Sequence, residues 1–153
     1  MGAGVVELET SVSKMVRREA AYYTIRWSRL QKADRYGILS LVPSMAGIFE
    51  LYYLDRKNKL NLFIFAKAWY GGLRNHLRTA TDAALEQDPA RRSILERHPC
   101  YYRYALLNSY RDMADIHFFF AATHFPRQNR TSHSGRYARI FVKELSPDKL
   151  VTI

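Results

Sequence analysis

The stretch NLFIFAKAWYGGLRNHLR, residues 61–78, decides the fold that we predict for this chain. The apolar run Leu60–Ala66 has the length of a buried strand, and two glycines separate it from a short basic segment. We therefore predict a strand that delivers the start of a helix to one edge of a sheet. The unpaired N–H groups and the positive dipole at such a helix start favour anions such as phosphate. Three basic side chains lie close by in the sequence: Lys67, Arg74 and Arg78.

Length and charge restrict the class of protein. The 153 residues correspond to a single domain with one core. The formal net charge of +10 points to a polyanionic partner, either nucleic acid or an anionic membrane surface. Cys100 is the only cysteine, which excludes an intrachain disulfide and a zinc site with several thiolates. No apolar run reaches the ~18 residues of a membrane span, so we expect a cytoplasmic protein with no membrane segment. We also expect no bound metal.

The N-terminal part of the chain has helical periodicity. From residue 10 to about residue 33, apolar residues recur at three- and four-residue steps, as in an amphipathic helix. Basic residues on the opposite face are either solvated or a second contact with phosphates. We therefore predict a helical extension over residues 1–35 that packs on the domain or on a protein partner. The apolar positions are Val12, Met15, Val16, Ala20, Tyr23, Trp27 and Leu30.

A β-hairpin is predicted in the middle of the chain. Residues 47–54 are rich in β-branched and aromatic side chains, and the polar loop 55–59 joins them to the strand that begins at Leu60. Both faces of the first strand carry apolar residues. We therefore expect both faces to be covered.

Capping residues and prolines mark the ends of the later helices. Asp88 followed by Pro89 begins one helix, and Ser109 with Asp112 three residues later resembles a capping box. The domain predicted over 36–145 then contains, after the glycines, a basic helix, a helix to His98, a strand over 100–107, a helix from 108 or 109 to 126, and a strand over 137–145. Residues 146–153 are predicted to be a tail.

Taken in order, these motifs resemble the GIY-YIG nuclease family over about residues 43–129. The motifs are Gly47-Ile48-Phe49, Phe63-Ile64-Phe65, Leu73-Arg74 with Leu77-Arg78, and the tetrapeptide PRQN at 126–129. The resemblance implies an α+β fold with a small three-stranded antiparallel sheet flanked by helices, to which the N-terminal helix and a C-terminal strand are added. It also implies a magnesium-dependent phosphodiester cleavage site on one face of that sheet.

Most residues of the family's active site are replaced in this chain. In the family, two tyrosines orient the attacking water, an arginine holds the phosphate, a glutamate binds the metal and an asparagine completes the site. The resemblance puts these roles on Phe49, Phe63, His76, His117 and Asn129. Phenylalanine lacks the hydroxyl, and imidazole is a poor ligand for magnesium. The resemblance therefore implies a degenerate member without cleavage activity and without a cofactor; magnesium is expected only if the protein is an active nuclease.

Three functional hypotheses follow from the sequence. The first is a protein that binds DNA or RNA through five basic residues near the expected site. The second is a protein-interaction module in which Phe49 and Phe63 fill the face of the sheet that carries the active site in the family, and the N-terminal helix contacts the partner. The third is an active magnesium-dependent endonuclease in which His76 or His117 acts as general base. The basic residues of the first hypothesis are Lys67, Arg74, Arg78, Arg127 and Arg130.

Overall fold

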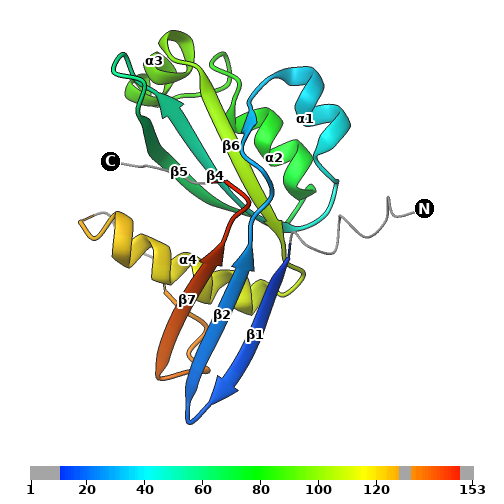
Figure 1. Cartoon of the computed structure of the whole chain (residues 1–153), viewed down its shortest axis with the longest axis vertical. Helices are drawn as coiled ribbons and strands as arrows, with labels where there is room; N and C mark the ends of the chain where they lie inside the picture. Colours follow the sequence, from blue (N-terminus) through cyan, green and yellow to red (C-terminus); the bar gives the residue numbers. More distant parts are fainter. Residues whose placement is uncertain (1–10, 128–131, 149–153) are drawn as a thin grey trace.

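The computed structural model describes residues 11–127 and 132–148, which form two β-sheets and four α-helices (Figure 1). One sheet has four strands in the order β3-β6-β4-β5, and the other has three in the order β1-β2-β7. The elements are β1 (Val12–Arg17), β2 (Ala20–Arg26), β3 (Gln31–Lys32), α1 (Arg35–Leu41), β4 (Gly47–Leu54), β5 (Leu60–Ala68), α2 (Gly72–Ala80), α3 (Pro89–Arg97), β6 (Cys100–Leu106), α4 (Tyr110–His124) and β7 (Arg139–Leu145). The fold is α+β, but the predicted architecture with a single three-stranded sheet is wrong.

The predicted N-terminal helix is also wrong, because residues 12–26 form a β-hairpin of β1 and β2. Arg18 and Glu19 make its two-residue turn with φ angles of 50° and 65°. Glycine or asparagine normally supplies this left-handed backbone, so the sequence carries no turn signal here. Along β2 the buried side chains, among them Tyr23 and Ile25, alternate with exposed ones. This period of two is that of a strand with one covered face.

The four-stranded sheet contains the predicted hairpin and is covered on both faces, as expected. In the loop between β4 and β5, Asp55 accepts hydrogen bonds from the backbone N–H groups of Lys57 (2.8 Å) and Lys59 (3.0 Å). On β4, Ile48 packs in the cluster that includes α4, whereas Phe49 packs in the cluster that includes α1 and α2. The sheet therefore lies between two layers, with α1, α2 and α3 on one side and α4 on the other.

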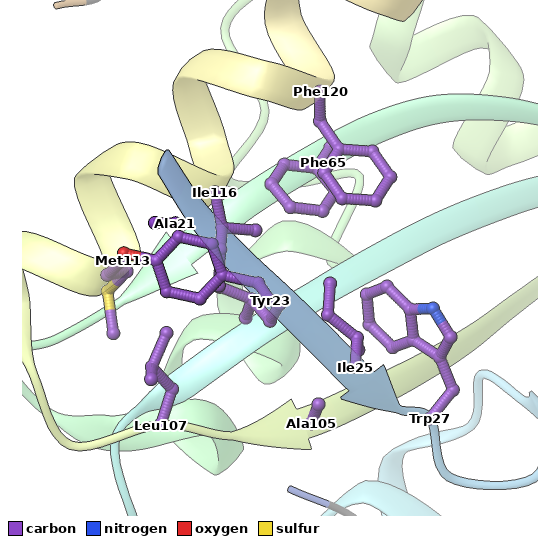
Figure 2. Close-up of a cluster of buried hydrophobic side chains, with 11 residues drawn as sticks. Ala21, Tyr23, Ile25, Trp27, Phe65, Ala105, Leu107, Met113, Ile116 and Phe120 are labelled. Carbon is purple, nitrogen blue, oxygen red and sulfur yellow. The ribbon is translucent and has the colours of Figure 1, made fainter. Parts of the chain in front are cut away.

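The three-stranded sheet packs one face against α4 (Figure 2). Tyr23 and Ile25 of β2 point toward Ile116 and Phe120 of α4 and toward Phe65 of β5. The rings of Phe65 and Phe120 stack with centroids 4.3 Å apart. The core cluster on this side therefore joins α4 and both sheets.

The last predicted strand is present as β7, but it pairs with β2 in the second sheet. The pairing is parallel and runs from Ala20 opposite Arg139 to Arg26 opposite Leu145. β2 is thus the central strand of its sheet, between the adjacent β1 and the sequence-distant β7.

Capping residues start the later helices at the predicted places. The side chains of Asp88 and Ser109 accept hydrogen bonds from backbone N–H groups in the first turns of α3 and α4. α2 begins at Gly72, whose φ is 75°. A Cβ at this position would lie 2.9 Å from the backbone carbon of Ser44, so glycine is required where α2 approaches the preceding loop.

Candidate nucleic-acid interface

The positions that the resemblance assigned to an active site lie on both sides of the four-stranded sheet. Phe49 is buried in the cluster beneath α2, and Phe63 packs at the edge of the same cluster. His76 lies on α2, where its ring donates to a backbone carbonyl, and Asn129 lies outside the described residues. His117 lies on α4, which covers the opposite face. The four described positions are therefore not brought together around one site.

The surroundings of His117 do not fit a magnesium ion. Its Nδ1 is buried without a hydrogen-bond partner in the described part of the chain. Burial lowers the pKa of His117, and the positive charge of Lys67 lowers it further. A neutral imidazole beside a cation lacks the oxygen donors that magnesium prefers. Residues 11–127 and 132–148 hold no group of three or more His, Cys, Asp or Glu side chains placed to bind a metal ion.

The basic residues predicted to bind nucleic acid are likewise spread over the molecule. Lys67 lies on the α4 side of β5, whereas Arg74 and Arg78 lie on α2, across the sheet. Arg127 is exposed just beyond the end of α4, and Arg130 lies outside the described residues. Lys67 is therefore separated from the two arginines of α2 by the sheet.

The N–H groups at the start of α2 are already bonded within the protein. The N–H of Leu73 donates to the carbonyl of Met45 (2.8 Å), and that of Arg74 donates to the carbonyl of Pro43 (3.3 Å). Two of the groups that were expected to meet a phosphate therefore face backbone carbonyls.

The three-stranded sheet has one face that no described element covers. In Figure 1 its strands lie in front of α4, which covers the other face. We call the uncovered face, formed by alternate residues of the three strands, the outer face. Its residues are Ser13, Met15 and Arg17 of β1, Ala20, Tyr22, Thr24 and Arg26 of β2, and Arg139, Phe141, Lys143 and Leu145 of β7. Ala20, which lies between Arg17 and Arg139, is buried.

An apolar and aromatic row crosses the middle of the outer face. Met15, Tyr22 and Phe141 are register partners, and they are 60%, 39% and 43% exposed. The rings of Tyr22 and Phe141 stack with centroids 5.1 Å apart and an interplanar angle of 16°. Large apolar side chains grouped in the open usually mark a binding surface.

Cations flank this row on both sides. Arg17 and Arg139 share the next row toward the hairpin turn, and Lys143 and Arg26 follow in the two rows on the other side. Successive rows on one face of a sheet are about 7 Å apart. Glu144 is the only carboxylate in the three strands, and it bonds to residues on the inner side of the sheet. The outer face therefore presents four positive side chains and no negative one.

A buried network holds the three-stranded sheet on α4. Asp115, which is 0% exposed, accepts a hydrogen bond from the hydroxyl of Tyr23 (3.0 Å), and Asp112 accepts from Lys14 (3.0 Å) and Arg136 (2.8 Å). Burial by itself raises the pKa of Asp112, but the hydrogen bonds from Arg136, Lys14 and Tyr23 outweigh it, and the pKa is lowered. Burial also raises the pKa of Tyr23, which therefore stays a donor at neutral pH.

A second network joins the two sheets. Arg103 of β6 donates to Glu50 of β4 (2.7 Å) and to Glu144 of β7 (3.2 Å). The hydroxyl of Tyr52 donates to Glu50 (2.6 Å), and the indole N–H of Trp27 donates to Glu144 (2.8 Å). Burial raises the pKa of Glu50, although the positive charge of Arg103 opposes this shift. These bonds fix the orientation of the outer face relative to the four-stranded sheet.

The outer face ends at a pocket of about 990 Å³, which we call the end pocket. It lies between the end of β2 and the loop after it, the end of α1 and its following residues, α2, β6, and the end of β7 with residues 146–147. Among the described residues, three arginines line it, Arg26, Arg29 and Arg74, and no carboxylate does. Arg26 and Leu145 belong to both the outer face and the end pocket.

The outer face was missed by sequence analysis because the N-terminal segment was assigned to a helix. The signal that points to it is the alternation in residues 20–26, where Tyr22, Thr24 and Arg26 occupy one face of a strand and the apolar Ala21, Tyr23 and Ile25 occupy the other.

Comparisons with known proteins identify a family without assigning an activity. A family model described as "Uncharacterised protein" matches residues 11–153. No curated protein and no solved structure matches the chain. Among the described residues, no helix is both long and apolar enough to cross a membrane.

Proposed function

The chain belongs to the family described as "Uncharacterised protein", and we propose from its geometry that it binds single-stranded nucleic acid, DNA or RNA, on the outer face. The observation that carries this proposal is the stacked pair of Tyr22 and Phe141 at the centre of four exposed cations. Such a role agrees with the cytoplasmic location predicted from the sequence.

The exposed rings favour an unpaired strand. Bases in a single strand are free to stack on aromatic side chains, and every base has a face that can stack, so such contacts tolerate many sequences. Tyr22 and Phe141 stack on each other, and the ring faces that point away from this contact form an aromatic platform for a base, with Met15 beside Tyr22. In a duplex the bases are already stacked and paired, so a platform of this kind gains nothing from them.

The cations favour a polyanion over a neutral partner. Arg17, Arg139, Lys143 and Arg26 lie in rows on both sides of the platform, so a backbone that crosses the face meets positive charge before and after the stacked bases. Neutralising phosphates releases counterions, so the affinity should fall steeply with salt concentration. The net charge of +10 adds a long-range attraction of the same sign.

Fluorescence anisotropy with labelled oligonucleotides tests the proposal. We expect binding to single-stranded DNA or RNA that weakens with salt, and weaker binding to a duplex of the same length. Tyr22→Ala should lower the affinity roughly 5- to 150-fold, because each lost base stack is worth about 1–3 kcal/mol. Arg17→Gln with Arg139→Gln should reduce the slope of log affinity against log salt by about 1.4, because two phosphate contacts are lost.

A matched control removes the same charge elsewhere. Arg56→Gln with Lys57→Gln changes two exposed cations in the loop between β4 and β5, away from the outer face. This variant should keep nearly all of its affinity. Equal losses in the two double variants would show that binding depends on net charge alone, and binding of a protein partner in place of oligonucleotides would also overturn the proposal.

A further inference from the structure

The end pocket continues the outer face in the direction that a bound strand would take. The last row of the outer face consists of Arg26 and its register partner Leu145, and both also line the end pocket. A single-stranded nucleic acid bound along β2 therefore reaches the end pocket without leaving positively charged surface.

The charges of the end pocket are not neutralised within the described protein. None of the three arginines that line it forms an ion pair in residues 11–127 and 132–148. The Nε of Arg74 donates to the carbonyl of Val42 (2.8 Å), which holds the side chain in place and leaves the two terminal nitrogens of its guanidinium for other acceptors. A fixed guanidinium of this kind suits an anion with several oxygens.

One of the residues that line the end pocket, Tyr102, carries a buried donor without a partner among the described residues. Tyr102 lines the pocket and is 0% exposed, and its hydroxyl makes no hydrogen bond within the described residues. Burial raises the pKa of Tyr102 to about 12, so its hydroxyl remains protonated at neutral pH. Because an unpaired buried hydroxyl is costly, a small shift of this side chain that brought the hydroxyl to an oxygen of a bound ligand would stabilise the complex.

The remaining surface of the end pocket suits a ring. Tyr104 lines it together with the apolar side chains of Leu41, Met45 and Leu106. A volume of about 990 Å³ lies at the upper end of the range typical of small-ligand sites. The pocket thus combines cations for a phosphate with apolar and aromatic walls for a base.

We infer that the end pocket binds a nucleotide that carries a phosphate monoester, as the phosphorylated end of the strand on the outer face. This inference rests on the proposed function. A phosphate monoester carries a charge of about −1.5 to −2 at neutral pH, more than an internal phosphodiester. Three arginines that form no ion pair within the described residues therefore favour a phosphorylated end.

Oligonucleotides that differ only at one end test the inference. We would compare single strands with a 5′-phosphate, a 3′-phosphate or hydroxyls at both ends, at one salt concentration. One phosphorylated form should bind at least roughly tenfold tighter than the hydroxyl form, as expected for added charge-assisted hydrogen bonds. Equal affinity for all three overturns the inference and leaves the proposed function standing.

Variants of the end pocket should remove this preference without removing binding. Arg74→Gln and, separately, Arg29→Gln should lower the affinity for the phosphorylated end and leave that for the hydroxyl form nearly unchanged. Arg91→Gln on α3 removes an exposed arginine far from the pocket lining and should keep the preference. Arg29 is exposed, so its variant decides the matter even if the Arg74 variant does not fold. A preference that survives both pocket variants overturns the inference.

Titration with free mononucleotides tests binding to the end pocket independently of binding to the outer face. In a Trp69→Phe variant, Trp27 is the remaining tryptophan, and it lines the end pocket. Its fluorescence should change on titration with a nucleoside monophosphate, and far less with the unphosphorylated nucleoside or inorganic phosphate. If no oligonucleotide binds but the monophosphate does, the proposed function fails and the pocket remains a nucleotide site for free ligand. If neither binds, both ideas fail.

Discussion

β4 and β2 are each an interior strand of their sheet, yet their sequences have different patterns. The first six residues of β4 are all buried, because helices cover one face of its sheet and α4 with the second sheet covers the other. β2 alternates between buried and exposed residues, because α4 covers only one of its faces. A strand with both faces covered contributes its side chains to the hydrophobic core on both sides. The strand with an uncovered face keeps aromatic and cationic side chains exposed to solvent.

The difference between covered and uncovered faces also separates the residues that stabilise the fold from those proposed to bind a ligand. Large losses of stability are expected where the two sheets are joined, and small losses on the outer face. The following predictions test this division, from the largest expected effect to the smallest.

Arg103→Met should cause the largest loss. It leaves the carboxylate of Glu50, which is 1% exposed, without its cationic partner, and it also removes the bond to Glu144. Breaking one half of a buried ion pair costs about 3–5 kcal/mol of unfolding free energy. Urea denaturation monitored by circular dichroism measures it. The double variant Arg103→Met with Glu50→Met should recover much of the loss, and a loss below about 1 kcal/mol for the single variant would contradict the proposed joining role.

Asp112 should make the three-stranded sheet sensitive to acid. Its pKa in the folded state is lowered, whereas an unperturbed aspartate titrates near about 3.9. Its stabilising contribution is therefore complete above the unfolded pKa and is lost as the pH falls toward the lower folded pKa. Asp112→Asn should cost about 1–3 kcal/mol at neutral pH.

The same variant should flatten the dependence of stability on pH between about 2 and 5. The measurement is a series of denaturation curves across this range. Glu96→Gln on the exposed face of α3 is the matched control and should leave the acid limb unchanged. An unchanged acid limb in the Asp112 variant would show that the network with Lys14 and Arg136 does not stabilise the sheet.

The smallest effect is expected on the outer face. Tyr22→Ala with Phe141→Ala removes one exposed cross-strand pair, which is worth about 1 kcal/mol or less. Ile25→Ala on the inner face of the same strand should cost about 2–5 kcal/mol, because Ile25 is 0% exposed. Thermal and urea unfolding of the two variants compare the faces directly. A larger loss for the outer pair would mean that this face is part of the core.

Local signals predicted much of the four-stranded sheet and its helices. The β4–β5 hairpin followed from two apolar runs around a polar loop, and Asp88 and Ser109 marked helix starts by the chemistry of their side chains. These signals act over a few residues, so a sequence can show them without knowledge of the tertiary structure.

The second sheet and the candidate site were not predictable in the same way. The turn at Arg18 and Glu19 uses left-handed backbone without glycine, and apolar residues from both strands mimic helical spacing. The partner of β2 is β7, more than a hundred residues away, and no local pattern encodes that pairing. Because Tyr22 and Phe141 meet only through this pairing, the aromatic platform was invisible until the topology was known.

The parallel pairing of β2 with β7 also sets the order of events during synthesis. β2 leaves the ribosome more than a hundred residues before β7, the strand that completes its sheet. At typical translation rates of about 5–20 residues per second, the open edge of β2 waits for roughly 6–24 seconds. Because β1 covers only the other edge of β2, a nascent chain of this protein depends on a chaperone to keep the edge that faces β7 from pairing with a neighbour.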